Sequence, residues 1–434
     1  MKKSLLAVAA MGAFVSAAQA QSSVTVYGIL DVGYTGGSSR ISDSSKASTA
    51  GYNGGNQKST VNQFGQSAEQ TSRLGFKGVE DLGGGTSAFF TAEFALAPQD
   101  QDLSGNTQGG LNNRQTFVGL KKAGLGQTAI GLQYTPIFNA AAATDPGQLN
   151  NMVGNVVYAS SQGIASGSAA SNNTAFTNRT ANTLSLKSDN FAGFTASAIY
   201  TLNNKNATQT VIGSGTAAAT AGGNTNANGW GLGLDYTWNK FYATAAYQAL
   251  KQITASDGSV PTTTNTTLWT NQQANGATSA PYTGFAKAAG VTATSGEAVS
   301  GTGQNVQDNQ FYIAATYDFG ILKAYAQYVN RQASSTMNSN FFVKRSAEQI
   351  GVRSYITPTI EAWASGGLGR YSQFGANQPT ANFNGWQLGS NYWLSKRTNL
   401  YAIYGQTLVS TAATTATTTS AGFSNYAIGV RHTF

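Results

Sequence analysis

The sequence predicts an all-β protein, a transmembrane antiparallel β-barrel of 16 strands with long extracellular loops and short periplasmic turns. Three observations lead to this prediction. Larger apolar residues alternate with small or polar ones along many short stretches, which is the period of a strand and not of a helix. Short and long connections follow one another in turn along the chain. Only 10% of the residues are charged, against about 25% in soluble domains, and Cys is absent.

The first stretch of the chain has the pattern of a secretory signal peptide at residues 1–20, which leaves residues 21–434 for the barrel. Lys2 and Lys3 precede an apolar run, and small residues end it at Ala20. The run is too short for a membrane anchor, because a spanning helix needs about 20 apolar residues. Removing two of the 25 basic residues leaves a formal charge of 23 − 17 = +6. We therefore expect an exported, mildly basic protein that folds without disulfides.

The alternation is clear near both ends of the chain. In Val24–Tyr34 the larger apolar residues fall on one face and Asp31 on the other, and Tyr426–Phe434 alternates in the same way. Lipid offers no water to unpaired backbone groups, so spanning strands must close into a barrel. Apolar faces then meet lipid and polar faces surround water. We expect these two stretches to pair and close the cylinder.

The connections set the number of strands. Seven are short, at Glu80–Gly85, Lys121–Gln127, Ser188–Gly193, Trp238–Lys240, Asp318–Gly320, Thr357–Thr359 and Ser395–Thr398. Eight are long and rich in Ser, Thr, Asn, Gly and Ala, at about 35–69, 98–112, 136–178, 202–227, 252–307, 333–342, 372–381 and 410–422. Long loops are unusual inside a compact soluble domain but typical of one rim of a membrane barrel. A barrel of about sixteen strands is too wide for its side chains to fill, which leaves an aqueous channel.

Several blocks of the sequence, in this order, resemble the general porins of Gram-negative outer membranes, most closely the beta-proteobacterial type. The blocks are VTVYGILDVGY at the start of the mature chain, SRLGFKGVEDLGGG at Ser72–Gly85, RQTFVGL at Arg114–Leu120, YDFGILKAYAQY at Tyr317–Tyr328, LSKRTNLYAIYG at Leu394–Gly405 and the final VRHTF. The resemblance implies homotrimers of sixteen-stranded barrels with the third loop folded into each pore. It also implies contact with outer-membrane lipid and lipopolysaccharide, and that Phe434 belongs to an assembly signal read by the outer-membrane assembly machinery.

The resemblance also indicates where the pore is narrowest, because in such porins basic residues of the barrel wall face acidic groups on the third loop. Arg73 and Arg114 match the family's wall arginines, and Lys187 takes a similar place two strands further on. Lys77 has the same parity as Arg73. Two carboxylates of lumen parity complete this expected constriction by holding the basic cluster in place; they are Asp31 and Glu93.

The third loop departs from the better-known enteric porins. Over about Pro136–Asn178 its sole carboxylate is Asp145, and an acidic PEFGG-type motif is absent. A basic wall with few acids opposite it should have a positive potential, which repels cations in a narrow throat of low dielectric. We therefore expect a preference for anions. Other lumen-facing charges, such as Lys323, Arg331 and Arg431, are more simply interpreted as solvated wall residues.

The aromatic residues allow two interpretations. They could form a sugar-stacking track inside the lumen, but their recurrence near strand ends favours girdles at the two membrane interfaces for most of them. The set comprises Tyr27, Tyr34, Phe76, Phe117, Tyr242, Tyr247, Tyr317, Tyr328, Trp386 and Tyr404.

We do not expect enzyme activity, a metal, a cofactor or a nucleic-acid partner. The single histidine, His432, falls on the outward face of the last strand, where it can serve neither as base nor as lumen ligand. We expect a passive diffusion channel of the outer membrane for small hydrophilic solutes and ions. Two alternatives stay open: a substrate-selective channel, and a surface adhesin or receptor that uses the barrel as a scaffold for the long loop at 252–307.

Overall fold

A computed structural model describes residues 23–43, 56–105, 110–159, 175–212, 219–255, 306–335, 342–373, 380–411 and 419–434. The expected signal peptide at residues 1–20 lies outside the described residues. So does nearly all of the expected loop at 252–307.

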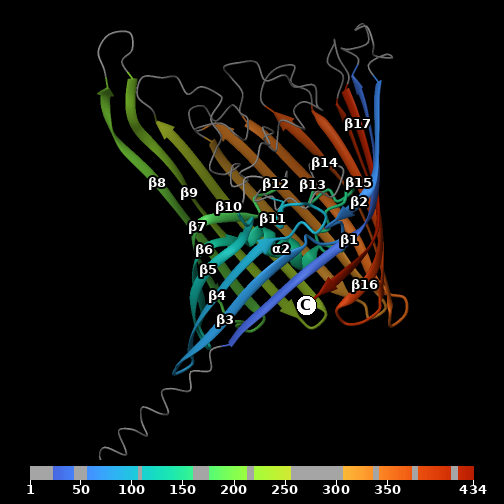
Figure 1. Ribbon diagram of the computed structural model, residues 1–434, viewed down its shortest axis with the longest axis horizontal. Helices are drawn as coiled ribbons and strands as arrows, with labels where there is room; N and C mark the ends of the chain where they lie inside the picture. Colours follow the sequence, from blue (N-terminus) through green and yellow to red (C-terminus); the bar gives the residue numbers. More distant parts are fainter. Residues whose placement is uncertain are drawn as a thin grey trace, which may run out of the picture.

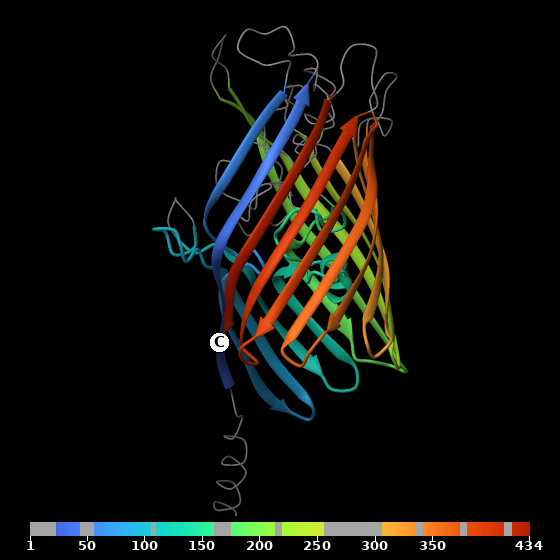
Figure 2. The same cartoon turned by 90° about the vertical axis from the view of Figure 1, so that its right-hand side faces the viewer.

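The described chain is almost entirely one antiparallel sheet that closes on itself (Figures 1 and 2). Its elements are β1 (Ser23–Asp43), β2 (Asn56–Gln66), β3 (Arg73–Gly83), β4 (Thr86–Ala95), β5 (Asn113–Lys122), β6 (Gly126–Tyr134), α2 (Pro136–Thr144), β7 (Arg179–Ser188), β8 (Phe194–Ile212), β9 (Ala219–Trp238), β10 (Phe241–Ala255), β11 (Val306–Asp318), β12 (Lys323–Ser335), β13 (Phe342–Tyr355), β14 (Ile360–Gln373), β15 (Ala381–Trp393), β16 (Thr398–Thr411) and β17 (Thr419–Thr433). Seven tight turns form one rim, called the turn rim here, and all seven fall where the sequence predicts them.

Closure is made by the first and last strands, as predicted. β1 pairs with β17 from Ile29 opposite Thr433 to Asp43 opposite Thr419. Beyond this ladder, Gly28 and Phe434 exchange both backbone hydrogen bonds at 3.1 Å. The Phe434 ring occupies the space that a side chain at Gly28 would need. In the half of the barrel nearer the turn rim, each described strand therefore has a neighbour on both sides, which a membrane barrel requires, whereas β2, further up, pairs with β1 alone.

The barrel has sixteen strand positions although the described chain holds seventeen strands. β2 pairs with the upper half of β1 and β3 with its lower half, so the two share one position and 17 − 1 = 16. The interruption at 67–72 leaves the sheet between them, and Ser67 adopts a positive φ of 61° there. The predicted count of sixteen is confirmed.

Two of the expected long loops are wrong in their bounds. Much of 35–69 belongs to β1 and β2, and much of 202–227 belongs to β8 and β9, which pair with each other as far as Ile212 opposite Ala219. These extensions are rich in Ser, Thr, Asn and Gly, so they lack the apolar alternation that predicts a strand. Backbone pairing needs no apolar face once a strand has passed beyond the lipid, which is why composition missed it.

The outer surface carries the apolar faces of the strands. Val24, Val118, Ile130, Ile350 and Ile428 are between 62% and 71% exposed. In the described part of the chain, no helix combines the length and the apolar character needed to cross a membrane. Most of the predicted girdle aromatics point outward as well.

Three exceptions among the girdle aromatics point into the lumen. One is Phe117, which alternates with the outward-facing Val118 and contacts Phe89. The Tyr27 hydroxyl donates to Glu93 at 3.1 Å, and the Tyr242 hydroxyl donates to Asp235 at 3.0 Å. For all three the girdle interpretation is wrong, and each of the two phenols serves as a partner for a lumen carboxylate.

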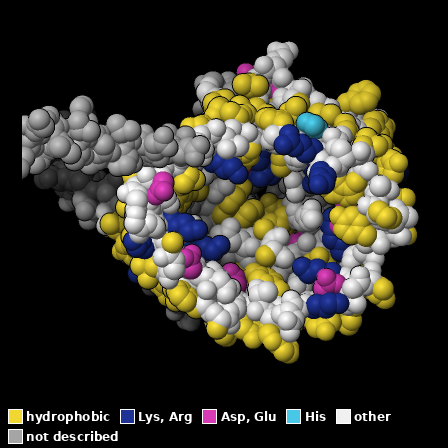
Figure 3. Space-filling view, turned by 90° about the horizontal axis from the view of Figure 1, so that it is seen from below, with side chains coloured by type: hydrophobic (Ala, Val, Ile, Leu, Met, Phe, Trp, Pro, Cys, Tyr) yellow, Lys and Arg dark blue, Asp and Glu magenta, His cyan; other side chains and the backbone are white. Residues whose placement is uncertain are grey.

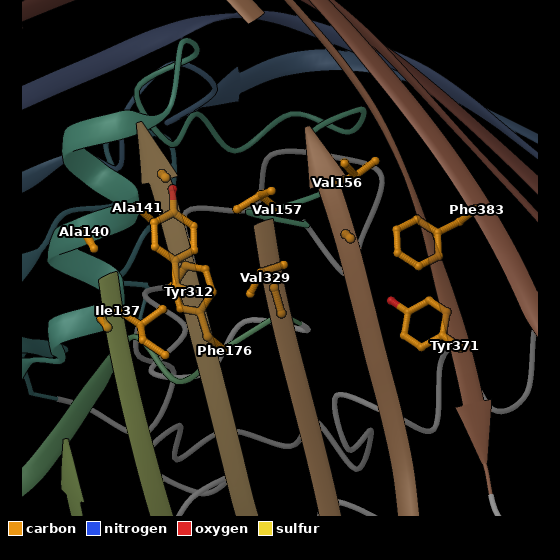
Figure 4. Close-up of a cluster of buried hydrophobic side chains, with 14 of the residues drawn as sticks. Ile137, Ala140, Ala141, Val156, Val157, Phe176, Tyr312, Val329, Tyr371 and Phe383 are labelled. Atoms are coloured by element: carbon orange, nitrogen blue, oxygen red, sulfur yellow. The ribbon is translucent and has the colours of Figure 1, made fainter. Parts of the chain in front are cut away.

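The third loop folds into the barrel, as the resemblance implies. It begins with α2, whose N-cap Thr135 accepts a hydrogen bond from the Phe138 amide at 3.3 Å and whose first position is a proline. The helix buries one face against the inner wall, chiefly β10 and β11. Figure 4 shows Ile137, Ala140 and Ala141 of α2, with Val156 and Val157 further along the loop, against Tyr312, Val329 and Phe383 of the wall.

Uncharged amides hold the loop backbone to this wall. Gln349 accepts from the Val156 amide at 3.0 Å, Gln310 accepts from the Thr177 amide at 2.7 Å, and Gln387 donates to the Val153 carbonyl at 2.7 Å. These three glutamines, called the amide belt here, are at most 1% exposed. Since buried backbone groups must be paired, the belt replaces the water that the loop loses on entering the barrel.

Glycines beneath the loop let its backbone approach the wall closely. A Cβ at Gly405 of β16 would overlap the Val153 carbonyl oxygen, and one at Gly385 of β15 would lie 2.6 Å from the Gly154 carbonyl oxygen. Neither atom can move without lifting the loop from the wall.

We predict that Gly405→Ala displaces the tip of the third loop and lowers the free energy of unfolding by about 1–3 kcal/mol, the usual cost of overpacking. Thermal unfolding in detergent would measure the loss. The matched control is Gly366→Ala on β14, where the nearest atom to an added Cβ lies 3.8 Å away. Equal melting of Gly405→Ala and Gly366→Ala would contradict the prediction.

Candidate pore constriction

Two predicted arginines and one predicted carboxylate meet on the wall formed by β3, β4 and β5. Arg114 Nε donates to Glu93 Oε1 at 2.8 Å, and Arg73 Nη1 lies 3.9 Å from the same oxygen. Arg114 and Glu93 are almost fully buried, whereas the Arg73 side chain keeps 20% exposure. Arg73 also donates from Nε to the Thr71 carbonyl at 2.9 Å, which ties it to the strand interruption.

A β-bulge aims Arg114 into the lumen. Val118 and Leu120 of β5 point outward, so simple alternation would send Arg114 outward as well. The β4–β5 ladder pairs Gln115 with Glu93 but Asn113 with Phe94, which leaves Arg114 as the extra residue. A bulge of this kind re-aims a side chain at a functional site. Arg114 therefore reaches Glu93 because of the bulge. Regular alternation along β5 would have pointed its side chain out of the barrel.

A third arginine, Arg179, belongs to this cluster, although the sequence pattern did not predict it as a constriction residue. It is the first residue of β7, is buried, and its guanidinium carbon lies 5.7 Å from the ring centroid of Tyr134. The Tyr134 hydroxyl in turn accepts from Arg114 Nη2 at 2.9 Å. Arg179 directly follows the third loop. This position, where the loop returns to the barrel wall, is the one sequence feature that could have indicated a role at the constriction. Arg73, Arg114, Arg179 and Glu93 are called the basic wall below.

The two predicted lysines lie nearer the turn rim. Lys77 is exposed, and its ammonium sits 5.4 Å from the centroid of the Tyr27 ring, whose hydroxyl bonds Glu93. Lys187 is also exposed, but it stands eight positions beyond Arg179 on β7, about 26 Å along the strand. The structure therefore brings Lys77 close to the basic wall and leaves Lys187 near the turn that follows β7.

Asp31 was expected to hold the basic cluster of the constriction, but its carboxylate stabilises a different part of the barrel. Its carboxylate accepts from the backbone amides of Glu69 at 2.9 Å and Gln70 at 2.7 Å, and from the Tyr401 hydroxyl at 2.6 Å. These contacts secure the interruption between β2 and β3. The basic wall is held by Glu93 alone of the two predicted carboxylates.

Asp145, the one charged residue of the third loop, turns away from the pore. Its oxygens accept from the Leu149 amide at 2.8 Å, from Asn155 Nδ2 at 2.7 Å and from Gln349 Nε2 at 3.1 Å, and it is 3% exposed. Burial raises the pKa of this carboxyl, since desolvation outweighs the hydrogen bonds that favour its ionised form. The loop thus presents no carboxylate to the basic wall.

Three further arginines of the barrel wall are each paired with an acid. Arg331 forms a two-pronged pair with Asp308, with the closest N···O distance 2.6 Å, and Arg431 lies 3.4 Å from Glu69. Both arginines are at most 5% exposed, so the expectation that they are solvated wall residues is wrong. Arg353 forms a further pair with Glu361 and also donates to the Pro146 carbonyl at 2.6 Å. These ion pairs neutralise three arginines, but a fourth, Arg345, is buried beside the third loop and donates to the Tyr371 hydroxyl and the Val156 carbonyl, with no ion pair among the described residues.

The basic wall keeps an excess of positive charge. Arg73 and Arg114 share Glu93, which leaves 2 − 1 = +1 before Arg179 and Lys77 are counted. Viewed from the turn rim, Figure 3 shows Lys and Arg side chains gathered around a hollowed centre, with hydrophobic side chains over the outer surface. Charged side chains therefore line the lumen on several sides, and the third loop that narrows it presents no carboxylate of its own.

Fold and site together define a transmembrane channel-type barrel with an inserted loop. The family model for the Gram-negative porins matches residues 7–412, and the chain belongs to this family. It is accordingly a β-barrel protein of the outer membrane. Among the described residues, no three His, Cys, Asp or Glu side chains lie together as a metal site would require.

Curated relatives and solved structures agree with this assignment. Outer membrane porin protein 32 of Delftia acidovorans is 33% identical over 207 residues, which cover 47% of this chain and 51% of the relative. An outer membrane porin protein of Bordetella pertussis is 34% identical over 150 residues, covering 34% and 37%. The chain thus spans about half the length, or less, of the curated relatives it matches. The anion-selective porin of Comamonas acidovorans has a TM-score of 0.57 at 20% identity over 95% of this chain and 100% of its own, which shows a shared fold.

We predict that Glu93→Gln destabilises the barrel by about 3–5 kcal/mol, because it leaves the buried Arg114 guanidinium without its carboxylate. Thermal unfolding in detergent at neutral pH would measure this. Glu80→Gln, at an exposed position near the turn-rim end of β3, is the matched control and should leave the melting temperature unchanged. A Glu93→Gln protein as stable as this control would show that the pair contributes nothing to the fold.

Proposed function

We propose that the protein is a passive diffusion channel for small hydrophilic solutes and ions, with a preference for anions. The lumen of a sixteen-stranded barrel is too wide to be filled by wall side chains, and the third loop narrows it without supplying a pore-facing carboxylate. Solutes would cross down their gradients, with no covalent step and no cofactor.

The excess charge of the basic wall is the observation that carries the anion preference. An ion in a narrow pore stays within a Debye length of the wall, about 10 Å at 0.1 M salt, so a fixed charge there is not screened. A positive charge at such a site lowers the free energy of an anion in the pore and raises that of a cation. The name of the Comamonas acidovorans structure, an anion-selective porin, supports the same choice.

Homotrimerisation, contact with lipopolysaccharide and recognition by the outer-membrane assembly machinery belong to this proposal as well. They are supported by membership of the porin family. The Phe434 ring, packed over Gly28 beside the turn rim, provides an accessible aromatic at the end of the last strand for the assembly signal.

A channel explains the site better than an enzyme or a scaffold. The single histidine, His432, is exposed and bonds Thr398 at 2.9 Å outside the lumen, so it cannot act on a solute in the pore. The adhesin alternative rests on the loop at 252–307, which lies largely outside the described residues. Conductance separates a general channel, which follows bulk ion mobility, from a scaffold with a closed lumen.

We predict anion-favouring reversal potentials across a KCl gradient in planar bilayers, with current steps in groups of three. Arg73→Gln should reduce the ratio of chloride to potassium permeability about fivefold to tenfold, because one charge acting across ~7 Å of water favours the anion and disfavours the cation by about 0.6 kcal/mol each. Lys58→Gln is the control, because Lys58 is an exposed residue of β2 far above the basic wall. Cation preference in the unaltered protein would refute the electrostatic proposal, and absence of conductance would refute the channel.

A second prediction concerns assembly. Deleting Phe434 should strongly reduce insertion into the outer membrane while export to the periplasm continues, as measured by membrane fractionation. Phe434→Tyr keeps a ring over Gly28 and should insert normally. Refolding of the deletion variant in detergent distinguishes the causes: unimpaired refolding locates the defect in recognition, whereas a barrel that cannot refold would assign Phe434 to closure only.

A further inference from the structure

An aromatic pair stands between the third loop and the basic wall, and neither barrel closure nor ion conduction requires it. The rings of Tyr134 and Phe138 are stacked, with centroids 4.1 Å apart and an angle of 14° between their planes. Arg114 donates to the Tyr134 hydroxyl, and Arg179 lies over the Tyr134 ring. Tyr158 meets Phe138 edge-on, with centroids 6.4 Å apart.

The rest of the loop surface beside this pair is uncharged and mostly apolar. α2 buries Pro136, Ile137, Ala140, Ala141 and Thr144 against the wall. The 3.6-residue period therefore turns Asn139, Ala142 and Ala143 toward the lumen, where they are exposed, and places the half-buried Phe138 on the flank nearest Tyr134. Guanidinium groups and aromatic rings thus lie side by side at the constriction.

We propose that this constriction binds aromatic carboxylates, small anions with a carboxylate on a planar ring, in preference to aliphatic carboxylates of the same charge. The inference rests on the proposed function, because such a solute needs an open anion path. Its carboxylate would meet the guanidinium groups of the basic wall, of which Arg73 is the most exposed. Its ring would pack against the half-buried Phe138 of the aromatic pair, because the Tyr134 ring is already covered by Phe138 and Arg179.

The physical reason is that the two contacts are made by different parts of one solute. Guanidinium groups match the planar geometry of a carboxylate and form charge-assisted hydrogen bonds with it. Aromatic rings add a geometry-dependent attraction beyond the area they bury. Acetate can use only the first contact. A solute with nine non-hydrogen atoms, such as benzoate, has enough contact for millimolar affinity, which slows passage without preventing it.

The test is block of the chloride current through single channels at constant ionic strength and pH 7. Benzoate, cyclohexanecarboxylate and acetate are added in turn, and the concentration that halves the current is recorded. For the unaltered protein we expect half-block by benzoate at a concentration at least fivefold below that of either other carboxylate. Equal concentrations for benzoate and cyclohexanecarboxylate would overturn the role of stacking.

Variants locate the effect on Phe138. Phe138→Ala should raise the half-blocking concentration of benzoate about threefold to tenfold and leave that of acetate unchanged. Phe138→Tyr keeps the ring and should retain the affinity for benzoate. Asn139→Ala, the neighbouring exposed position of α2, is the control and should behave as the unaltered protein does. An unchanged benzoate block in Phe138→Ala would overturn the proposal.

Two checks keep this test apart from failure of the fold or of the channel. Chloride conductance of Phe138→Ala is measured first, because a displaced loop would change it. In that case Phe138→Tyr is compared with the unaltered protein, each with benzoate and cyclohexanecarboxylate. Loss of the preference for benzoate in Phe138→Tyr, which keeps the ring, would overturn the proposal. The reversal potential in KCl is recorded before any carboxylate is added. Loss of anion preference at that stage refutes the proposed function, whereas anion preference without benzoate selectivity refutes only this inference.

Discussion

Backbone pairing in lipid is the constraint on which the rest of the structure depends. Water cannot reach the hydrogen-bonding groups of a strand in the hydrocarbon region, so the sheet must close, and β1 must meet β17. Closure with sixteen positions in turn fixes a lumen that wall side chains cannot fill. The third loop can enter the barrel because the lumen is this wide. It fills part of the aqueous space, and at the constriction that it forms a solute passes close enough to the wall to interact with it.

The way the loop is held decides the electrostatics of the pore. Its backbone leaves bulk water and must find partners on the wall, and the amide belt provides them without net charge. Glycines such as Gly405 let the loop backbone lie against the strands, and an apolar cluster around Ile137 and Tyr312 packs the remaining contact. Two arginines add to these anchors, since Arg345 donates to the Val156 carbonyl and Arg353 to the Pro146 carbonyl. None of these anchors presents a carboxylate to the pore, so the field of the basic wall is not compensated from the loop.

Much of the fold was predictable because a barrel repeats one rule along the chain. Alternation in Val24–Tyr34 and the tight turns fixed strand count, closure and sidedness. Polar strand extensions such as the end of β8 were missed because they lie beyond the lipid and need no apolar face. At the site, Arg73, Arg114 and Glu93 could be chosen from the sequence, but the bulge that turns Arg114 inward could not. Arg179 and the partners of Asp31 depend on where the loop and the strand interruption pass in space, which no local pattern encodes.

The two walls of the pore solve the same problem in opposite ways. Of the arginines buried beside the loop, Arg331 and Arg353 each have an acid of their own, because a buried charge without partners is costly. Arg345 has the Tyr371 hydroxyl, the Val156 carbonyl and the Phe383 ring as partners. On the basic wall, Arg73 remains partly exposed, so water and passing ions solvate it and a second carboxylate is unnecessary. At Arg73 the excess charge is therefore tolerated because the lumen stays open beside it. The group that attracts a solute is thus also one that the loop leaves uncovered.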